Sequence, residues 1–347
     1  MKNSENLALY RKYRPSTFDD VLGQDHIVSV LEKSVKDGSI SHAYLFVGTR
    51  GTGKTSVARI FAKEIGVSAN DLYEIDAASN RGIDDVRELR DGVHSLPFDS
   101  KYKVYILDEV HMFTKEAWNT LLKTLEEPPK HVIFILATTE LQKVPDTIVS
   151  RCQVFTFKKA SDIILKKMIQ DVSEKEGYEL ETGVAELIAI LGDGSFRDTL
   201  GYLQKILNFS KTKNIKKENA EEILGTPKTT LVNDFIVSIA KKDLAKGIET
   251  VQKASAENLD MKLYLKLIIM KFRVGIIMRY SPKLEEDMAG ELGNEDLDFL
   301  RELVKNSKEN FHSSVLVKLL EAYQNIDNAF ISELPLELAL IKILEDK

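Results

Sequence analysis

A glycine-rich octapeptide constrains the fold of this chain more than any other sequence feature. Residues 48–55 read GTRGTGKT and match the pattern GxxxxGK[ST] at every fixed position. A short apolar segment, residues 43–47, comes before the loop, and residues 56–65 follow it with helical spacing. A strand, a glycine-rich loop and a helix in this order predict a P-loop that binds ATP within an α/β fold.

The segments around this loop alternate between two kinds. Short runs rich in aliphatic and aromatic residues predict buried strands, and longer amphipathic runs between them predict helices. This alternation predicts a parallel sheet with helices on both faces. The expected strands are residues 43–47, 103–107, 132–137 and 154–157, and the expected helices are residues 56–65, 83–95 and 115–126.

Beyond residue 159 the pattern is helical to the end of the chain. A plausible linker, Gly225-Thr226-Pro227, separates the first of these helices from the rest. We therefore expect an α/β domain over residues 1–158, a small helical domain over 159–225 and a helical domain over 226–347. The strongly apolar helix at 263–278 could be buried inside its own domain or packed against a neighbouring subunit, and the sequence leaves both open.

Composition excludes several classes of protein. The single cysteine, Cys152, can form neither an intrachain disulfide nor a cysteine-rich zinc site, which fits a reducing compartment. The first 20 residues contain no apolar core typical of a signal peptide. We expect no membrane span, because the chain lacks a run of about 20 apolar residues. The net charge of −6 does not exclude a local basic surface for nucleic acid.

The P-loop, taken together with the end of one later strand, predicts a phosphate site with magnesium. Backbone N–H groups of the loop would surround the phosphates, Lys54 would reach the β- and γ-phosphates, and the Thr55 hydroxyl would coordinate Mg²⁺. The run VYILDE places Asp108 as a second Mg²⁺ ligand and Glu109 as the general base for water. The expected nucleotide contacts of the loop are Gly48, Thr49, Arg50, Gly51, Thr52, Gly53, Lys54, Thr55 and Ser56.

Three further motifs produce a family resemblance. Together with the P-loop, the runs DEVHM (108–112), TLEEPP (124–129) and SRC (150–152) resemble the AAA+ clamp-loader ATPases, above all the gamma/tau subunits of bacterial DNA polymerase III. The resemblance covers residues 1–225 and continues beyond them only in helical character and in the run LPLELAL. It implies an AAA+ domain, a helical lid and a C-terminal collar that oligomerises, in a protein of the bacterial cytoplasm.

The resemblance also implies functional residues near the nucleotide. Tyr10, Arg11 and Val21 correspond to the family's segment that borders the adenine. Thr138 or Thr139, where the strand at 132–137 ends, corresponds to the sensor of the γ-phosphate.

Two arginines correspond to residues that act on ATP during hydrolysis. Arg151 of the SRC run resembles the arginine finger, which acts on ATP held by a neighbouring subunit. Arg197 resembles the second sensor, which reaches ATP in its own chain. An arginine in either place can stabilise the charge of a transferring phosphoryl group.

The resemblance implies an assembly that holds DNA. Its partners would be further copies of this subunit together with delta and delta-prime in a five-subunit ring, the sliding clamp, and primer–template DNA contacted through phosphates. We expect Arg81 before the helix at 83–95, Arg87 within it and Lys115 at the start of the next helix to contact these phosphates. The competing interpretation is that they are solvated helix charges.

The chain departs from the family by lacking a four-cysteine zinc module. Residues 62–70 run almost directly into 74–79, so we expect no zinc. This keeps a replication-factor-C-like small subunit open, although Thr138-Thr139 and the DEVHM run favour the bacterial subunit. A different AAA+ DNA-remodelling motor also stays open, as does a catalytically inactive delta-prime-like subunit, which the intact P-loop residues disfavour. The chain ends where the third domain of the family would end, so we expect either a natural short form or a truncation.

Overall fold

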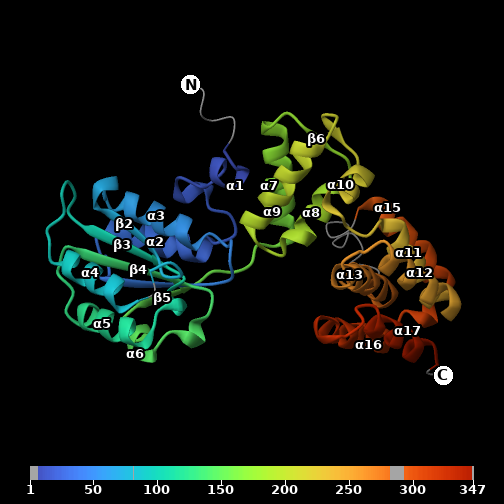
Figure 1. Cartoon of the computed structure of the whole chain (residues 1–347). Coiled ribbons are helices and arrows are strands. Elements are labelled where there is room, and N and C mark those ends of the chain that lie inside the picture. Colours follow the sequence, from blue (N-terminus) through green and yellow to red (C-terminus); the bar gives the residue numbers. More distant parts are fainter. Residues whose placement is uncertain (1–6, 81, 282–292, 346–347) are drawn as a thin grey trace. The chain divides into compact units, whose positions relative to one another are not determined.

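The computed structural model describes residues 7–80, 82–281 and 293–345 (Figure 1). The chain forms two compact units, Met1–Leu165 with Ala189–Gly201, and Lys166–Ile188 with Tyr202–Lys347. The division into three domains stays a prediction. Within the described ranges, no helix is long and apolar enough to cross a membrane.

A five-stranded parallel sheet forms the centre of the first unit, with strand order β2-β3-β4-β1-β5. The predicted parallel sheet is confirmed. Because all the strands run the same way, their carboxyl ends share one edge, where the loops after β1, β3 and β4 meet. The strands are β1 (Ala43–Val47), β2 (Leu72–Asp76), β3 (Lys103–Asp108), β4 (Val132–Thr138) and β5 (Gln153–Thr156).

Helices cover both faces of this sheet, as predicted. Side chains alternate along each strand, so Tyr44 and Phe46 of β1 face one core while Leu45 faces the other. Helices α2 and α3 cover the first core, and α4 and α5, with Trp118, cover the second. The helices of this part are α1 (Leu9–Lys12), α2 (Asp25–Asp37), α3 (Lys54–Glu64), α4 (Ile83–Val93), α5 (Lys115–Glu126) and α6 (Asp146–Val149).

The chain then becomes helical, with one short two-stranded pairing that the sequence did not predict. Strands β6 (Glu179–Leu180) and β7 (Asn214–Ile215) pair in parallel. The helices of this segment are α7 (Asp162–Lys175), α8 (Val184–Gly192), α9 (Phe196–Phe209) and α10 (Lys217–Leu224).

A helical core closes the chain, and it answers the question about the apolar helix. Tyr264, Ile268 and Phe272 of α13 are fully buried among α11, α12, α16 and α17, so this helix packs inside its own unit. The sequence also predicts a helix over residues 285–302 that is acidic on one face, and its first residues lie outside the described part of the chain. The helices are α11 (Thr229–Lys241), α12 (Leu244–Ala256), α13 (Met261–Tyr280), α15 (Asn294–Asn306), α16 (Ser313–Asn325) and α17 (Leu334–Glu345).

Candidate nucleotide site

The P-loop connects β1 to α3 and has a backbone that requires glycine. Gly51 and Gly53 have φ angles of 78° and 103°, a left-handed region that other residues rarely adopt. A Cβ on Gly48 would lie 2.7 Å from the carbonyl oxygen of Phe157. The loop ends at the N-terminus of α3, whose N–H groups favour an anion. The strand–loop–helix context predicted from the sequence is confirmed.

Lys54 lies folded into this loop. Its Nζ donates to the carbonyl oxygens of Gly48 (2.7 Å) and Thr49 (3.0 Å), and the residue is 5% exposed. Burial lowers the pKa of Lys54, while the nearby carboxylates of Glu109 and Asp108 act in the opposite direction. The ammonium group therefore lies inside the curve of the loop, where the phosphates of a nucleotide would lie.

Thr55 and Asp108 bring two oxygen ligands together. The Thr55 hydroxyl donates to Asp108 Oδ2 at 2.7 Å, and Asp108 Oδ1 accepts the N–H of Glu109 at 2.9 Å. Mg²⁺ prefers such oxygen ligands and keeps several waters, so this pair fits it. In the described part of the chain, no cluster of three or more His, Cys, Asp or Glu side chains forms a metal site.

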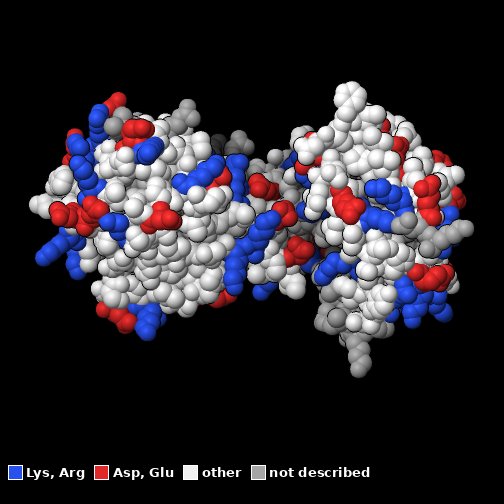
Figure 2. All heavy atoms as spheres, turned by 90° about the horizontal axis from the view of Figure 1, so that it is seen from below, with Lys and Arg blue, Asp and Glu red and all other residues white. Residues whose placement is uncertain are grey.

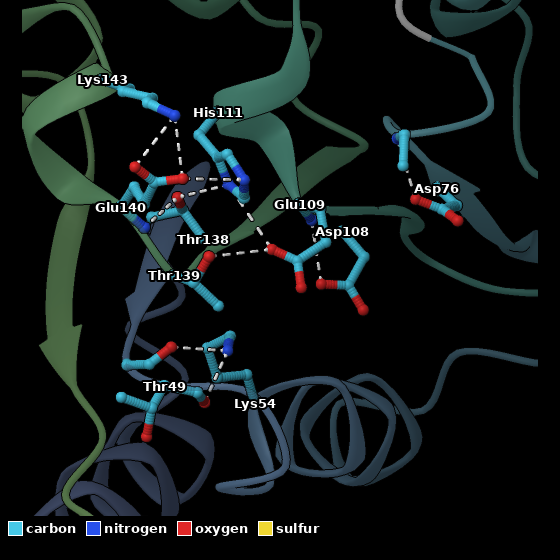
Figure 3. A network of polar contacts seen from close by, with 12 residues as sticks. Thr49, Lys54, Asp76, Asp108, Glu109, His111, Thr138, Thr139, Glu140 and Lys143 are labelled. Carbon is cyan, nitrogen blue, oxygen red and sulfur yellow. Dashed lines mark hydrogen bonds and ion pairs between the residues drawn. The ribbon is translucent and has the colours of Figure 1, made fainter. Parts of the chain in front are cut away.

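Glu109 begins a polar network that the sequence did not predict (Figure 3). Its Oε2 accepts the Thr139 hydroxyl at 3.3 Å and lies 3.4 Å from Nδ1 of His111. His111 also contacts the buried Thr138 hydroxyl, at 3.2 Å, and Glu140, at 3.5 Å. The structure thus separates the two sensor candidates, since Thr139 contacts Glu109 and Thr138 contacts His111.

The start of α9 docks on the P-loop. The N–H of Phe196 donates to the Gly51 carbonyl at 3.0 Å. A Cβ on Gly51 would lie 2.0 Å from Oγ of Ser195 and 3.3 Å from Cβ of Arg197. The Ser195 hydroxyl is itself fixed, because it accepts the N–H of Asp198 at 3.2 Å. The absence of a side chain at Gly51 therefore permits this contact, which places Arg197 beside the loop.

Arg197 and the N-terminal segment form a cationic side of the site. The Arg197 guanidinium carbon lies 5.9 Å from the centre of the Tyr10 ring, and that of Arg11 lies 5.7 Å from it. The two cations lie near each other, so the charge of Arg197 lowers the pKa of Lys54. Val21 packs at the edge of the core under α2 and α3. The structure thus brings Tyr10, Arg11 and Arg197 together.

Arg151 lies at the opposite edge of the sheet. It precedes β5, whereas the P-loop follows the parallel strand β1. Its guanidinium donates to the Thr147 carbonyl and to Glu126 Oε1, both at 2.6 Å. Arg151 is therefore the one predicted catalytic residue that the fold does not bring to its own P-loop.

The predicted DNA contacts fall in three different situations. Arg81 lies outside the described residues. Arg87 is exposed and pairs with Asp84 at 2.9 Å. Lys115 is exposed in the first turn of α5, which Thr114 caps by accepting the N–H of Ala117. On the face drawn in Figure 2, Lys and Arg are interspersed with Asp and Glu. The three DNA contacts stay predictions.

Comparisons with known proteins agree with the fold and with the motifs. The family model described as DNA polymerase III, delta subunit, matches residues 23–76 and 66–161. DNA polymerase III subunit tau of Bacillus subtilis (strain 168) is 40% identical over 299 residues, 80% of this chain and 53% of the relative. DNA polymerase III subunit gamma of Buchnera aphidicola subsp. Baizongia pistaciae (strain Bp) is 35% identical over 298 residues, 80% of each chain.

A solved structure resembles the fold at low sequence identity. The Holliday junction branch migration motor RuvB of Thermotoga maritima superposes with a TM-score of 0.53 and 21% identity over 65% of this chain and 79% of its own. This likeness shows the fold alone. The chain spans about half the length of several curated relatives it matches.

Proposed function

Because the chain belongs to the gamma/tau subunits of DNA polymerase III, we propose that it is an ATPase motor subunit of a clamp loader. Its ATP binding and hydrolysis would load the sliding clamp onto primed DNA during replication. One observation carries the proposal, namely that Lys54, Thr55, Asp108 and Glu109 converge at one edge of the sheet.

Each of these residues has a role that follows from its position. Lys54 binds the β- and γ-phosphates from inside the loop, and Thr55 with Asp108 holds Mg²⁺. The metal, when bound, neutralises charge on the phosphate oxygens. Glu109 orients the attacking water and accepts its proton, because its carboxylate lies near the Lys54 ammonium group and therefore near the bound phosphates.

The remaining site residues complete the nucleotide environment. Thr139 contacts Glu109 directly and is the better-placed sensor of the γ-phosphate. Thr138 contacts His111 instead and has a supporting role. Arg197 stabilises charge on ATP of its own chain, and Tyr10, Arg11 and Val21 border the adenine. The other backbone and side-chain contacts come from Gly48, Thr49, Arg50, Gly51, Thr52, Gly53 and Ser56.

Arg151 makes the site dependent on assembly. Since it lies at the far edge of the sheet, its guanidinium serves ATP of an adjacent subunit. We propose a ring with further copies of the chain, delta and delta-prime, in which residues 159–225 form a lid and 226–347 a collar. Arg87, Lys115 and Arg81 would contact primer–template phosphates, and the assembly works in the bacterial cytoplasm.

The test is ATP hydrolysis by the reconstituted complex. We expect sliding clamp and primed DNA together to stimulate turnover, and Lys54→Ala and Glu109→Gln to abolish the stimulated rate. Lys54→Ala should also lose ATP binding, whereas Glu109→Gln should retain it. A wild-type complex whose turnover does not respond to clamp and primed DNA would contradict the proposed function.

A further inference from the structure

His111 lies between two carboxylates that come from different strand ends. It belongs to the 3₁₀ helix Val110–Met112, which follows β3, and its side chain is 9% exposed. Nδ1 lies 3.4 Å from Glu109 Oε2, and Nε2 lies 3.5 Å from Glu140 Oε1 (Figure 3). Nδ1 also lies 3.2 Å from the Thr138 hydroxyl, its shortest polar contact, so a proton on Nδ1 is shared between Thr138 and Glu109, and a proton on Nε2 points toward Glu140.

Glu140 is held in place from two sides. Its backbone N–H donates to the Thr138 hydroxyl at 3.0 Å, and its carboxylate accepts from Lys143 Nζ at 2.9 Å. Lys143 ends the 3₁₀ helix Leu141–Lys143, which follows β4. A continuous polar chain therefore runs from Lys143 through Glu140 and His111 to Glu109.

Glu109 has an uncommon backbone conformation and a partly exposed side chain, so contacts from neighbouring side chains are needed to hold its carboxylate in one orientation. Its φ angle of 51° lies in the left-handed region, which is uncommon for a residue with a side chain. Glu109 is also 29% exposed, so water competes for its carboxylate. Contacts from His111 and Thr139 both engage Oε2 and so fix the direction in which Oε1 points.

We propose that His111 is a positioning residue for Glu109. By linking Oε2 of Glu109 to the Glu140–Lys143 pair, the imidazole keeps the carboxylate oriented toward the attacking water. The inference rests on the proposed function, in which Glu109 is the general base. It assigns to His111 an effect on turnover and none on nucleotide binding, because His111 contacts Glu109 and not the P-loop residues that hold phosphate.

The test uses variants of His111 in the reconstituted complex with clamp and primed DNA. His111→Phe keeps the ring volume without its nitrogens, and we expect kcat to fall about tenfold while the KM for ATP stays within about twofold. His111→Asn places a polar atom near the position of Nδ1 and should recover part of kcat. His111→Gln reaches the position of Nε2 instead and should recover less.

Two comparisons separate positioning from a structural effect. His94→Phe, a change at an exposed histidine, should match the wild type in kcat. The thermal midpoint of His111→Phe should also match that of the wild type.

The outcomes distinguish this inference from the proposed function. A wild-type complex that clamp and DNA do not stimulate refutes both. A stimulated wild type, an inactive Glu109→Gln and a fully active His111→Phe refute only the role of His111. A loss of kcat in His111→Phe that comes with a lower thermal midpoint and weaker ATP binding, and that Asn does not recover, refutes it as well.

Discussion

The contact between Gly51 and the start of α9 makes a sharp prediction for Gly51→Ala. The added Cβ would meet Ser195 Oγ at 2.0 Å, a distance that forces the hydroxyl to move. Rotation of Ser195 alone is insufficient, because its Cβ would still lie 3.1 Å away and that of Arg197 3.3 Å away. We therefore expect the first turn of α9 to move away from the P-loop.

The expected loss in the free energy of unfolding has two parts. A left-handed alanine costs roughly 1–2 kcal/mol relative to glycine. Loss of the Ser195 cap on the Asp198 N–H adds about 1 kcal/mol. We expect Gly51→Ala to lower the free energy of unfolding by about 2–3 kcal/mol, since these two effects act together.

A matched control isolates the contact. Gly38 also has a positive φ angle, 63°, but a Cβ there meets no atom within 4 Å. Gly38→Ala should therefore show only the backbone cost of about 1–2 kcal/mol. Adding Ser195→Gly to Gly51→Ala should relieve the clash but not restore the cap.

Urea unfolding and the binding of a fluorescent ATP analogue measure both consequences. Gly51→Ala should weaken ATP binding because Arg197 moves with α9, whereas Gly38→Ala should leave binding unchanged. Equal destabilisation by Gly51→Ala and Gly38→Ala, with unchanged ATP affinity in both, would contradict a steric contact between residue 51 and the start of α9.

Three further changes test other parts of the structure. Thr55→Val removes the hydroxyl that donates to Asp108, so the gain in ATP affinity that Mg²⁺ provides should shrink in titrations with and without the metal. Burial raises the pKa of Asp71, but N–H groups of residues 98–100 outweigh it and lower the pKa to about 2. This depressed pKa stabilises the fold above about pH 4 and the effect is lost as pH falls toward 2, so the unfolding midpoints of Asp71→Asn and the wild type should converge over that range. Arg151→Ala should leave ATP affinity of the isolated chain unchanged and reduce turnover of the assembled complex by about 10³-fold, and loss of affinity in the isolated chain would contradict a role in trans.

The sequence predicted most of the sheet because its inner strands are continuously apolar. Strand β2 was missed, since Glu74 and Asp76 interrupt its apolar pattern. The sheet order explains this composition. β2 lies at an edge and pairs only with β3, so its side chains are less enclosed and charged residues are tolerated.

From the residues alone, the site was predictable where a contiguous motif carries it, whereas Tyr10, Arg11 and Arg197 were predicted from the family resemblance. Lys54 and Thr55 are fixed relative to the loop by the local chain, and Asp108 by the end of its strand. Ser195 and His111 carry no such signal, because their importance depends on contacts between separate segments. The choice between Thr138 and Thr139 likewise depends on contacts with Glu109 and His111, which come from another strand end and leave no mark in the local sequence.

The position of Arg151 at the sheet edge opposite the P-loop also bears on how copies of the chain can join. In the proposed assembly, where Arg151 serves ATP of a neighbour, the surface that offers the arginine meets a different surface that offers the nucleotide, so the contact would be head-to-tail and have a direction. An open arc of such subunits always has one P-loop at one end without a donor, and one arginine at the other end without a nucleotide. The number of complete sites is therefore one fewer than the number of subunits until the arc closes or a different protein occupies the gap.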